Sequence, residues 1–226
     1  MRKLTATIPV VLIVLSLVSS VPRRAAAATA LGTSTWSVEI GTNLGAGNTD
    51  GSFAIRKHSS ASTAFRFGIE VDLDNTDGNG TITDTGSPDV NLEQNFDFNS
   101  TALSIQWMHF APIRDNVTAT FAVGPVVEIT RQSQRSTEGT RGQPGFDEDE
   151  FRFSSMTFGL DLGLGVEWFF SRRLSLGGQT GLRAVTGSGN EVDIDRSNTS
   201  KTETDLEVDV TEVNVGTARI QLTGYF

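Results

Sequence analysis

The segment from Met156 to Trp168, MTFGLDLGLGVEW, alternates strictly between apolar side chains and small or charged ones. Its apolar residues are Met156, Phe158, Leu160, Leu162, Leu164, Val166 and Trp168. A period of two is typical of a β-strand with one apolar face. The segment's 13 residues exceed the roughly 9–11 that a tilted strand needs to cross a bilayer. This stretch therefore predicts a strand whose apolar face is long enough to span a membrane.

The same alternation recurs along the chain and predicts eight strands. Further apolar columns begin near Trp36, Phe53, Phe65, Leu103, Val117, Leu174 and Val208. Short connections are predicted near residues 58–61, 112–116 and 171–173, and long polar ones near 75–95, 132–150 and 187–205, with an intermediate one at 45–51. This order predicts an all-β, eight-stranded antiparallel up-and-down barrel. The last column changes phase near Gly216, which predicts a β-bulge.

The faces opposite the apolar columns carry charges of both signs. These are Glu39, Arg56, Arg66, Glu70, Glu128, Asp161, Glu167, Arg183 and Arg219. Alternation alone fits either a soluble barrel with its apolar face inside or a membrane barrel with that face outside. Arginines beside glycines fit a narrow interior, and lysine is scarce. We therefore predict a transmembrane barrel with this charge network in its lumen.

Aromatic side chains gather beside the predicted short connections. They are Trp107, Phe110, Trp168, Phe169 and Phe170. Membrane barrels place aromatic girdles at the two membrane–water interfaces. We therefore expect these five side chains to lie at one interface.

The first thirty residues have the pattern of a secretory signal peptide. Arg2 and Lys3 precede the apolar run VVLIVLSLV, and small residues that suit cleavage follow near Ala28 or Ala30. The run is too short to span a membrane as a helix. Cleavage removes four basic residues and no acidic one, so the formal net charge falls from −9 to −13. The sequence thus divides into a signal peptide, residues 1–30, and a barrel domain, residues 31–226.

The chain resembles the small outer-membrane β-barrel proteins of Gram-negative bacteria. The resemblance rests on the signal peptide, the eight alternating strands, the stretch GLGVEWFFSRRLSLGGQTGLRA and the terminal RIQLTGYF. It implies a location in the bacterial outer membrane, a monomer among lipids, short turns in the periplasm and long loops outside the cell. It also implies that Tyr225 and Phe226 form a C-terminal signal for the outer-membrane assembly machinery.

Composition excludes several chemistries. The chain has no cysteine, which excludes thiol nucleophiles and Cys-ligated zinc, and its acidic balance excludes a basic nucleic-acid-binding surface. The two histidines, His58 and His109, lie at the short-connection rim. Some barrels of the family are lipid A enzymes with a catalytic histidine near the extracellular side, and these two stand at the opposite rim. No Ser/His/acid set is evident from spacing, so we predict a non-enzymatic protein without a cofactor.

The stretch NTDGNGTITD, residues 75–84, resembles the start of a calcium-binding loop. Asn75, Asp77 and Asn79 stand at alternate positions, but the twelfth position holds Gly86 where a bidentate acid is needed. The acidic run 147–150 is predicted to be a solvated loop edge. We therefore predict no metal site and keep the three residues only as a weak candidate.

Three functions fit these observations. The first is a structural barrel whose long loops make surface contacts. The second is a narrow channel for small solutes, and the third is a secreted soluble barrel that binds a ligand. Eight strands enclose an interior just wide enough for side chains, and an unpaired buried charge costs about 3–5 kcal/mol. These considerations favour a lumen filled by paired charges over an open channel.

Overall fold

The computed structural model describes residues 35–43, 49–82, 90–139, 146–197 and 200–226, so the predicted signal peptide lies outside the described residues. The strands are β1 (Trp36–Asn43), β2 (Thr49–Ser60), β3 (Thr63–Ile82), β4 (Val90–Arg114), β5 (Val117–Glu138), β6 (Asp147–Phe169), β7 (Leu174–Ser197) and β8 (Lys201–Tyr225). Each strand pairs antiparallel with the next, and β1 pairs with β8 to close the barrel. This confirms the predicted eight-stranded up-and-down fold. No helix in the described part of the chain is long and apolar enough to cross a membrane.

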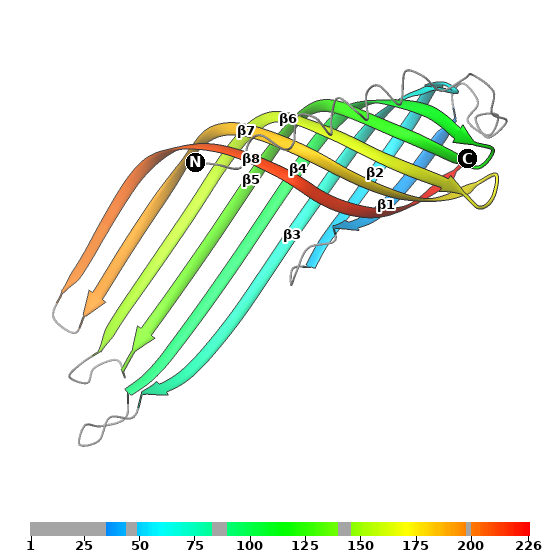
Figure 1. The fold of residues 1–226 in the computed structure, drawn as a ribbon. Coiled ribbons are helices and arrows are strands. Elements are labelled where there is room, and N and C mark those ends of the chain that lie inside the picture. The colour runs from blue at the N-terminus through cyan, green and yellow to red at the C-terminus, as the bar shows by residue number, and fades with distance from the viewer. Residues whose placement is uncertain (1–34, 44–48, 83–89, 140–145, 198–199) are drawn as a thin grey trace, which may run out of the picture.

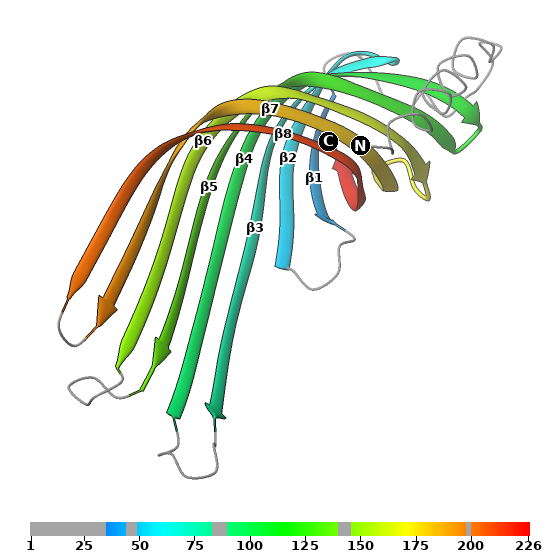
Figure 2. The same ribbon diagram turned by 60° about the vertical axis from the view of Figure 1, so that its left-hand side comes forward.

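The barrel is closed over only part of the length of its strands (Figure 1). The β1–β8 pairing runs from Ser37–Tyr225 to Asn43–Arg219, and β2 pairs with β3 only as far as Leu73. The strands β3 to β8 continue past this point as an open curved sheet, which Figure 2 shows from a second side. We call this part the outer sheet. It comprises residues 74–82, 90–99, 131–138, 147–154, 188–197 and 201–211.

The outer sheet corrects the prediction of three long polar loops. Most of residues 75–95, 132–150 and 187–205 lie in paired strands, and the acidic run 147–150 belongs to β6. Cross-strand contacts replace the missing apolar column. Asn75 donates to Asp97 at 2.7 Å, and buried Glu148 accepts from Arg196 at 2.8 Å and lies 3.2 Å from Arg135. Once the membrane-spanning part fixes the register, polar residues continue the ladder.

The two faces of β6 show how the sequence pattern becomes a barrel wall. The outward side chains of Met156, Phe158 and Leu160 are 61%, 63% and 57% exposed, whereas inward Asp161 and Glu167 are buried. This arrangement is the reverse of a soluble protein, in which apolar side chains are buried. The structure therefore places the apolar columns on the outside of the barrel.

Two backbone features fit the chain to its narrow interior. A Cβ added at Gly159 would lie 1.9 Å from the Ala184 carbonyl oxygen, so the close approach of β6 and β7 requires glycine there. In β8 the register shifts by one residue, because Gly181 pairs with Thr217 and Leu182 pairs with Val215. The shift places the predicted bulge at Gly216.

Candidate functional site

The lumen is the candidate site, because it holds the buried charged groups of the barrel. All nine charged residues predicted for the lumen face it from strands of the closed part. Glu39, Arg56, Arg66 and Glu167 are at most 1% exposed. The nine groups comprise four arginines and five carboxylates, so their charges nearly cancel.

The cluster nearest the short turns, which we call the turn-side cluster, joins Arg56 and Arg66 to two carboxylates. Arg56 donates to Glu39 at 2.7 Å and to Glu167 at 3.1 Å. Arg66 donates to the other oxygen of Glu39 at 2.7 Å and to the Gln106 amide oxygen at 2.8 Å. Charge-assisted bonds of this kind offset the cost of burying both partners.

A second group, the middle cluster, lies further along the lumen. Arg183 donates to Glu70 at 2.7 Å and to Asp161 at 3.2 Å, and it lies 3.4 Å from Glu128. Arg219 lies 2.6 Å from the other oxygen of Glu70. Gln106 donates to Asp161 at 3.1 Å and so connects the two clusters. Gln106 was not among the residues predicted for the lumen network, although its position between Ile105 and Trp107 indicates an inward side chain.

An aromatic cap closes the lumen at the short-turn end and corrects part of the predicted girdle. Phe110 and Phe169 were expected at the membrane interface, but they are only 2% and 8% exposed and pack inside with Met108 and Tyr225. Side chains alternate between the two faces of a strand. Each of these phenylalanines directly follows or precedes an outward-facing residue, so its own side chain points inward. The Tyr225 hydroxyl donates to Glu167 beneath the cap.

The two histidines lie on opposite faces of the barrel wall. His58 belongs to β2, where a turn was predicted, and is fully buried with its ring 5.1 Å from Phe110 and 5.8 Å from Tyr225. Its two ring nitrogens form no hydrogen bond with the described residues. His109 stacks on Trp107 at 5.9 Å. The structure therefore joins neither imidazole to a nucleophile in the described part of the chain.

Little space remains around the middle cluster. A cavity of about 20 Å³ lies between Asp161, Gln179, Arg183 and Arg219. This volume is about that of one water molecule. Beside the cluster, Ala102, Val126 and Val185 pack together, and Ala102 pairs across the strands with both Glu70 and Glu128. The arrangement can hold charge and water but leaves no room here for a substrate.

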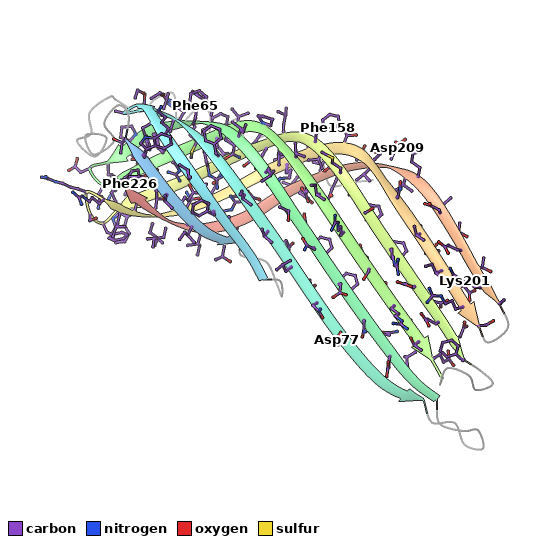
Figure 3. The ribbon with its side chains drawn as sticks, turned by 180° about the vertical axis from the view of Figure 1, so that it is seen from behind. Phe65, Asp77, Phe158, Lys201, Asp209 and Phe226 are labelled. Carbon is purple, nitrogen blue, oxygen red and sulfur yellow. The ribbon has the colours of Figure 1, made fainter. Side chains whose placement is uncertain are left out.

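The outer surface of the closed part is apolar and aromatic. Figure 3 shows Phe65, Phe158 and Phe226 on it, and Phe226 is 74% exposed. Three predicted interface aromatics also point outward, since Trp107, Trp168 and Phe170 are 40%, 46% and 47% exposed. They lie beside the short turns, at one end of the apolar surface. The two C-terminal residues diverge, with Tyr225 inside the barrel and Phe226 outside.

The weak calcium candidate lies on a strand. Asn75, Asp77 and Asn79 belong to β3, and Asn75 and Asp77 are exposed, whereas the Asn79 side chain lies outside the described residues. An extended strand cannot wrap its oxygens around one ion as a calcium loop does. This corrects the interpretation of residues 75–84 as a loop.

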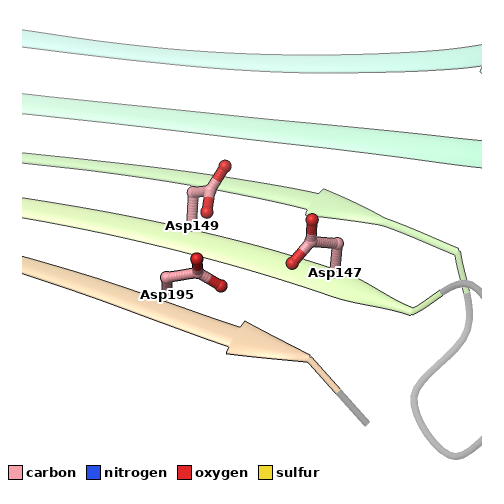
Figure 4. A group of neighbouring side chains, drawn as sticks. All are labelled: Asp147, Asp149 and Asp195. Carbon is pink, nitrogen blue, oxygen red and sulfur yellow. The ribbon is translucent and has the colours of Figure 1, made fainter. Parts of the chain in front are cut away.

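Three other carboxylates meet at the far end of the outer sheet. Asp147, Asp149 and Asp195 place one oxygen each within 4.8 Å of the others (Figure 4). All three are exposed. Partial desolvation, and then the charges of Asp147 and Asp195, raise the pKa of Asp149 above its ordinary value. The three carboxylates therefore repel one another. Exposed acidic groups of this kind are common without a bound ion, so their clustering does not by itself define a metal site.

Comparison with known proteins adds information at the level of the fold. No family model and no curated protein matches the sequence. Among solved structures, a major outer membrane protein from Thermus thermophilus matches with a TM-score of 0.54 and 16% identity, over 85% of this chain and 98% of that chain. Acinetobacter baumannii CarO2 and CarO match with TM-scores of 0.44 and 0.35, at 9% and 10% identity; they cover 85% and 86% of this chain and 98% of each of their own chains.

The closed barrel, its exposed apolar surface and its paired polar interior define an eight-stranded β-barrel of the membrane type. The Thermus thermophilus protein shares this fold at low sequence identity. The fold is therefore that of the outer-membrane β-barrel proteins.

Proposed function

We propose that this chain is a non-enzymatic structural barrel of the bacterial outer membrane, with a filled lumen and an outer sheet that makes contacts outside the cell. The observation that carries the proposal is the pairing of lumen charges across the barrel. The single side chain of Arg56, for example, connects β1 to β6 through ion pairs with Glu39 and Glu167. A solute would have to break such pairs, and separating a buried pair costs about 3–5 kcal/mol.

The order of layers along the lumen supports a closed interior. The aromatic cap comes first and the turn-side cluster follows, and the middle cluster lies beside Ala102, Val126 and Val185. An eight-stranded barrel has just enough interior for side chains. The same layers argue against catalysis, because their carboxylates pair with arginines and hydroxyl groups of the barrel itself.

Conductance tests this proposal against the narrow-channel alternative. The purified chain is inserted into a planar bilayer, with a porin of known conductance inserted under the same conditions as a positive control. We expect no discrete current steps from the chain. Regular steps of one size from well-folded protein would establish a channel and overturn the filled-lumen proposal.

We also propose how the chain is oriented and assembled in the outer membrane. The short turns face the periplasm, the outer sheet faces the exterior, and residues 1–30 are removed as a signal peptide. Phe226, exposed at the end of β8, serves with Tyr225 as the signal for the assembly machinery, and the barrel stands as a monomer among lipids. Deleting Phe226 should slow assembly in cells while leaving refolding from denaturant intact, whereas equal loss in both would make Phe226 a structural residue only.

A further inference from the structure

A polar hollow lies on the outward side of the barrel wall, just past the end of the apolar surface. Its volume is about 920 Å³, and its outward-facing lining residues include Leu73, Asn75, Asn99, Arg131, Arg152 and Asn190. Leu73 belongs to the last apolar row, and the other five begin the outer sheet. The hollow therefore opens on the lipid-facing side at the level where acyl chains give way to headgroups.

The lining of the hollow suits a phosphate that carries hydroxyl groups. Arg131 is exposed and forms no ion pair with any described residue. Arg152 is 58% exposed and pairs with Glu150 at the edge of the hollow, and Asp97 accepts a bond from Asn75. Amide groups, such as those of Asn99 and Asn190, can bond to hydroxyls. The lining also includes the carboxylates of Asp74 and Asp97. Guanidinium groups match phosphate geometry, and Arg131 is the cation of the hollow that no described carboxylate occupies.

An apolar groove lies on the same strands, nearer the middle of the apolar surface. It has a volume of about 480 Å³, and its lining includes Phe53, Phe67, Leu103, Ile105 and Val127. Both features lie on β3, β4 and β5. A single outward row, Val71, Thr101 and Ile129, separates them. Outward residues two apart are about 7 Å apart along a strand, so a short span separates the hollow from the groove.

We propose that the outward face of β3 to β5 binds one anionic lipid, with its phosphate-bearing headgroup in the hollow and an acyl chain in the groove. The proposal rests on the membrane placement given above. A lipid fits better than a peptide because the groove lies inside the apolar surface, where lipid chains are the available ligands. The polar hollow and the apolar groove follow one another in the order that headgroup and chain have in a lipid.

Native mass spectrometry of the folded chain in a neutral detergent tests this site. Dimyristoyl phosphatidylglycerol and dimyristoyl phosphatidylcholine are titrated separately, and the bound fraction is measured for each. A basic residue at a membrane surface strengthens the binding of an anionic lipid by about fivefold. The double variant Arg131→Gln, Arg152→Gln removes two such residues and should therefore weaken phosphatidylglycerol binding by about 25-fold and leave phosphatidylcholine binding nearly unchanged.

Two further variants separate the parts of the site. Arg114→Gln removes an exposed arginine at the opposite rim and should leave the preference for phosphatidylglycerol unchanged. Val127→Trp fills the groove and should weaken binding of both lipids. An equal preference in wild type and double variant, or an equal loss with Arg114→Gln, would overturn the proposal. Displacement of the lipid by excess inorganic phosphate would reduce the site to an anion site and overturn the lipid assignment.

Heat-modifiable gel mobility of every variant keeps the two proposals apart. A closed barrel migrates differently before and after boiling. If wild type fails this assay and does not insert into vesicles, the membrane placement is wrong. If all variants insert but prefer phosphatidylglycerol to the same extent as wild type, the membrane placement stands and only the lipid site is wrong.

Discussion

Arg56 is fully buried, and its guanidinium joins carboxylates from two distant strands. Glu39 accepts from it at 2.7 Å and Glu167 at 3.1 Å. The centre of the Phe110 ring lies 5.9 Å from its central carbon. Burying such a group is unfavourable unless its donors are occupied. Arg56 therefore holds the turn-side cluster and the aromatic cap in one arrangement.

Replacing Arg56 by methionine should destabilise the barrel strongly. The substitution preserves much of the volume but leaves Glu39 with Arg66 and Glu167 with only hydroxyl donors, and removing one partner of a buried pair costs about 3–5 kcal/mol. Urea unfolding from lipid vesicles measures the change. Arg173→Met, at an exposed turn position, should change stability by less than about 0.5 kcal/mol. Similar small effects at both positions would mean that the lumen is hydrated and its charges uncoupled.

Asp149 should titrate above the ordinary range of aspartate. Partial desolvation raises its pKa from 3.8, and the neighbouring charges of Asp147 and Asp195 raise it further. A folded-state pKa above the unfolded value means that the folded state binds the proton more tightly, so this contribution to stability is lost as the pH rises through the folded-state pKa. Carboxyl NMR titration measures the value, and Asp195→Asn should lower it. A pKa at or below 3.8 would contradict the clustering in Figure 4.

At the scale of the element, the outer sheet protects basic residues that a loop would expose. Arg131 and Arg135 lie in β5, which pairs with β4 on one side and β6 on the other. Proteases need an extended, locally unfolded segment, and paired strands seldom open. Limited trypsin treatment of the folded chain should therefore cut after Arg172 or Arg173 well before it cuts at either residue of β5. Arg141, in the same region of the sequence, lies outside the described residues.

The relative rates of trypsin cleavage distinguish paired strands in the outer sheet from flexible loops. Heat-unfolded chain, cut at every accessible arginine and lysine, provides the control. Cleavage after Arg131 as fast as after Arg173 would show that the strands end near the apolar surface. The long-loop prediction would then stand in place of the outer sheet.

The sequence predicts the strands of the closed part, whose outward face is apolar, but it does not predict the strands of the outer sheet, which are mostly polar. Alternation from Met156 to Trp168 identifies the outward side of β6, because each apolar residue of that stretch points outward. Most residues of the outer sheet are polar, so its composition indicated loops. Two short signals were present: Phe96 and Phe98 alternate in β4, as do Phe151 and Phe153 in β6, and all four are half-buried on the inward side.

The candidate site shows the same division. Alternation places charged residues inside, but it cannot say which arginine meets which carboxylate, because the partners come from strands far apart in sequence. Arg66 pairs with Glu39, for example, although the two residues lie on strands that are not neighbours in the sheet. Phe110 and Phe169 were predicted at the membrane interface because they lie near short turns, although the alternation along their strands places both on the inward face.

At the scale of the whole molecule, one sheet serves two environments. Its closed part carries apolar side chains outward and paired charges inward, and its open part carries mostly polar side chains. Closure removes the unpaired strand edges that lipid would penalise, whereas edges beyond the membrane can be hydrated. The central claim is therefore that the outward face of the closed part contacts acyl chains.

Methyl NMR of the chain in bilayer nanodiscs that contain lipids with a paramagnetic label on the acyl chain tests this claim most directly. Leu160, Leu162 and Ile105 point outward, whereas Val126 and Val185 are 1% and 4% exposed inside the lumen. We predict strong broadening of the three outward methyl signals and little change in the two valines. Equal broadening of both sets, or stronger broadening of the valines, would show that the apolar columns do not face lipid.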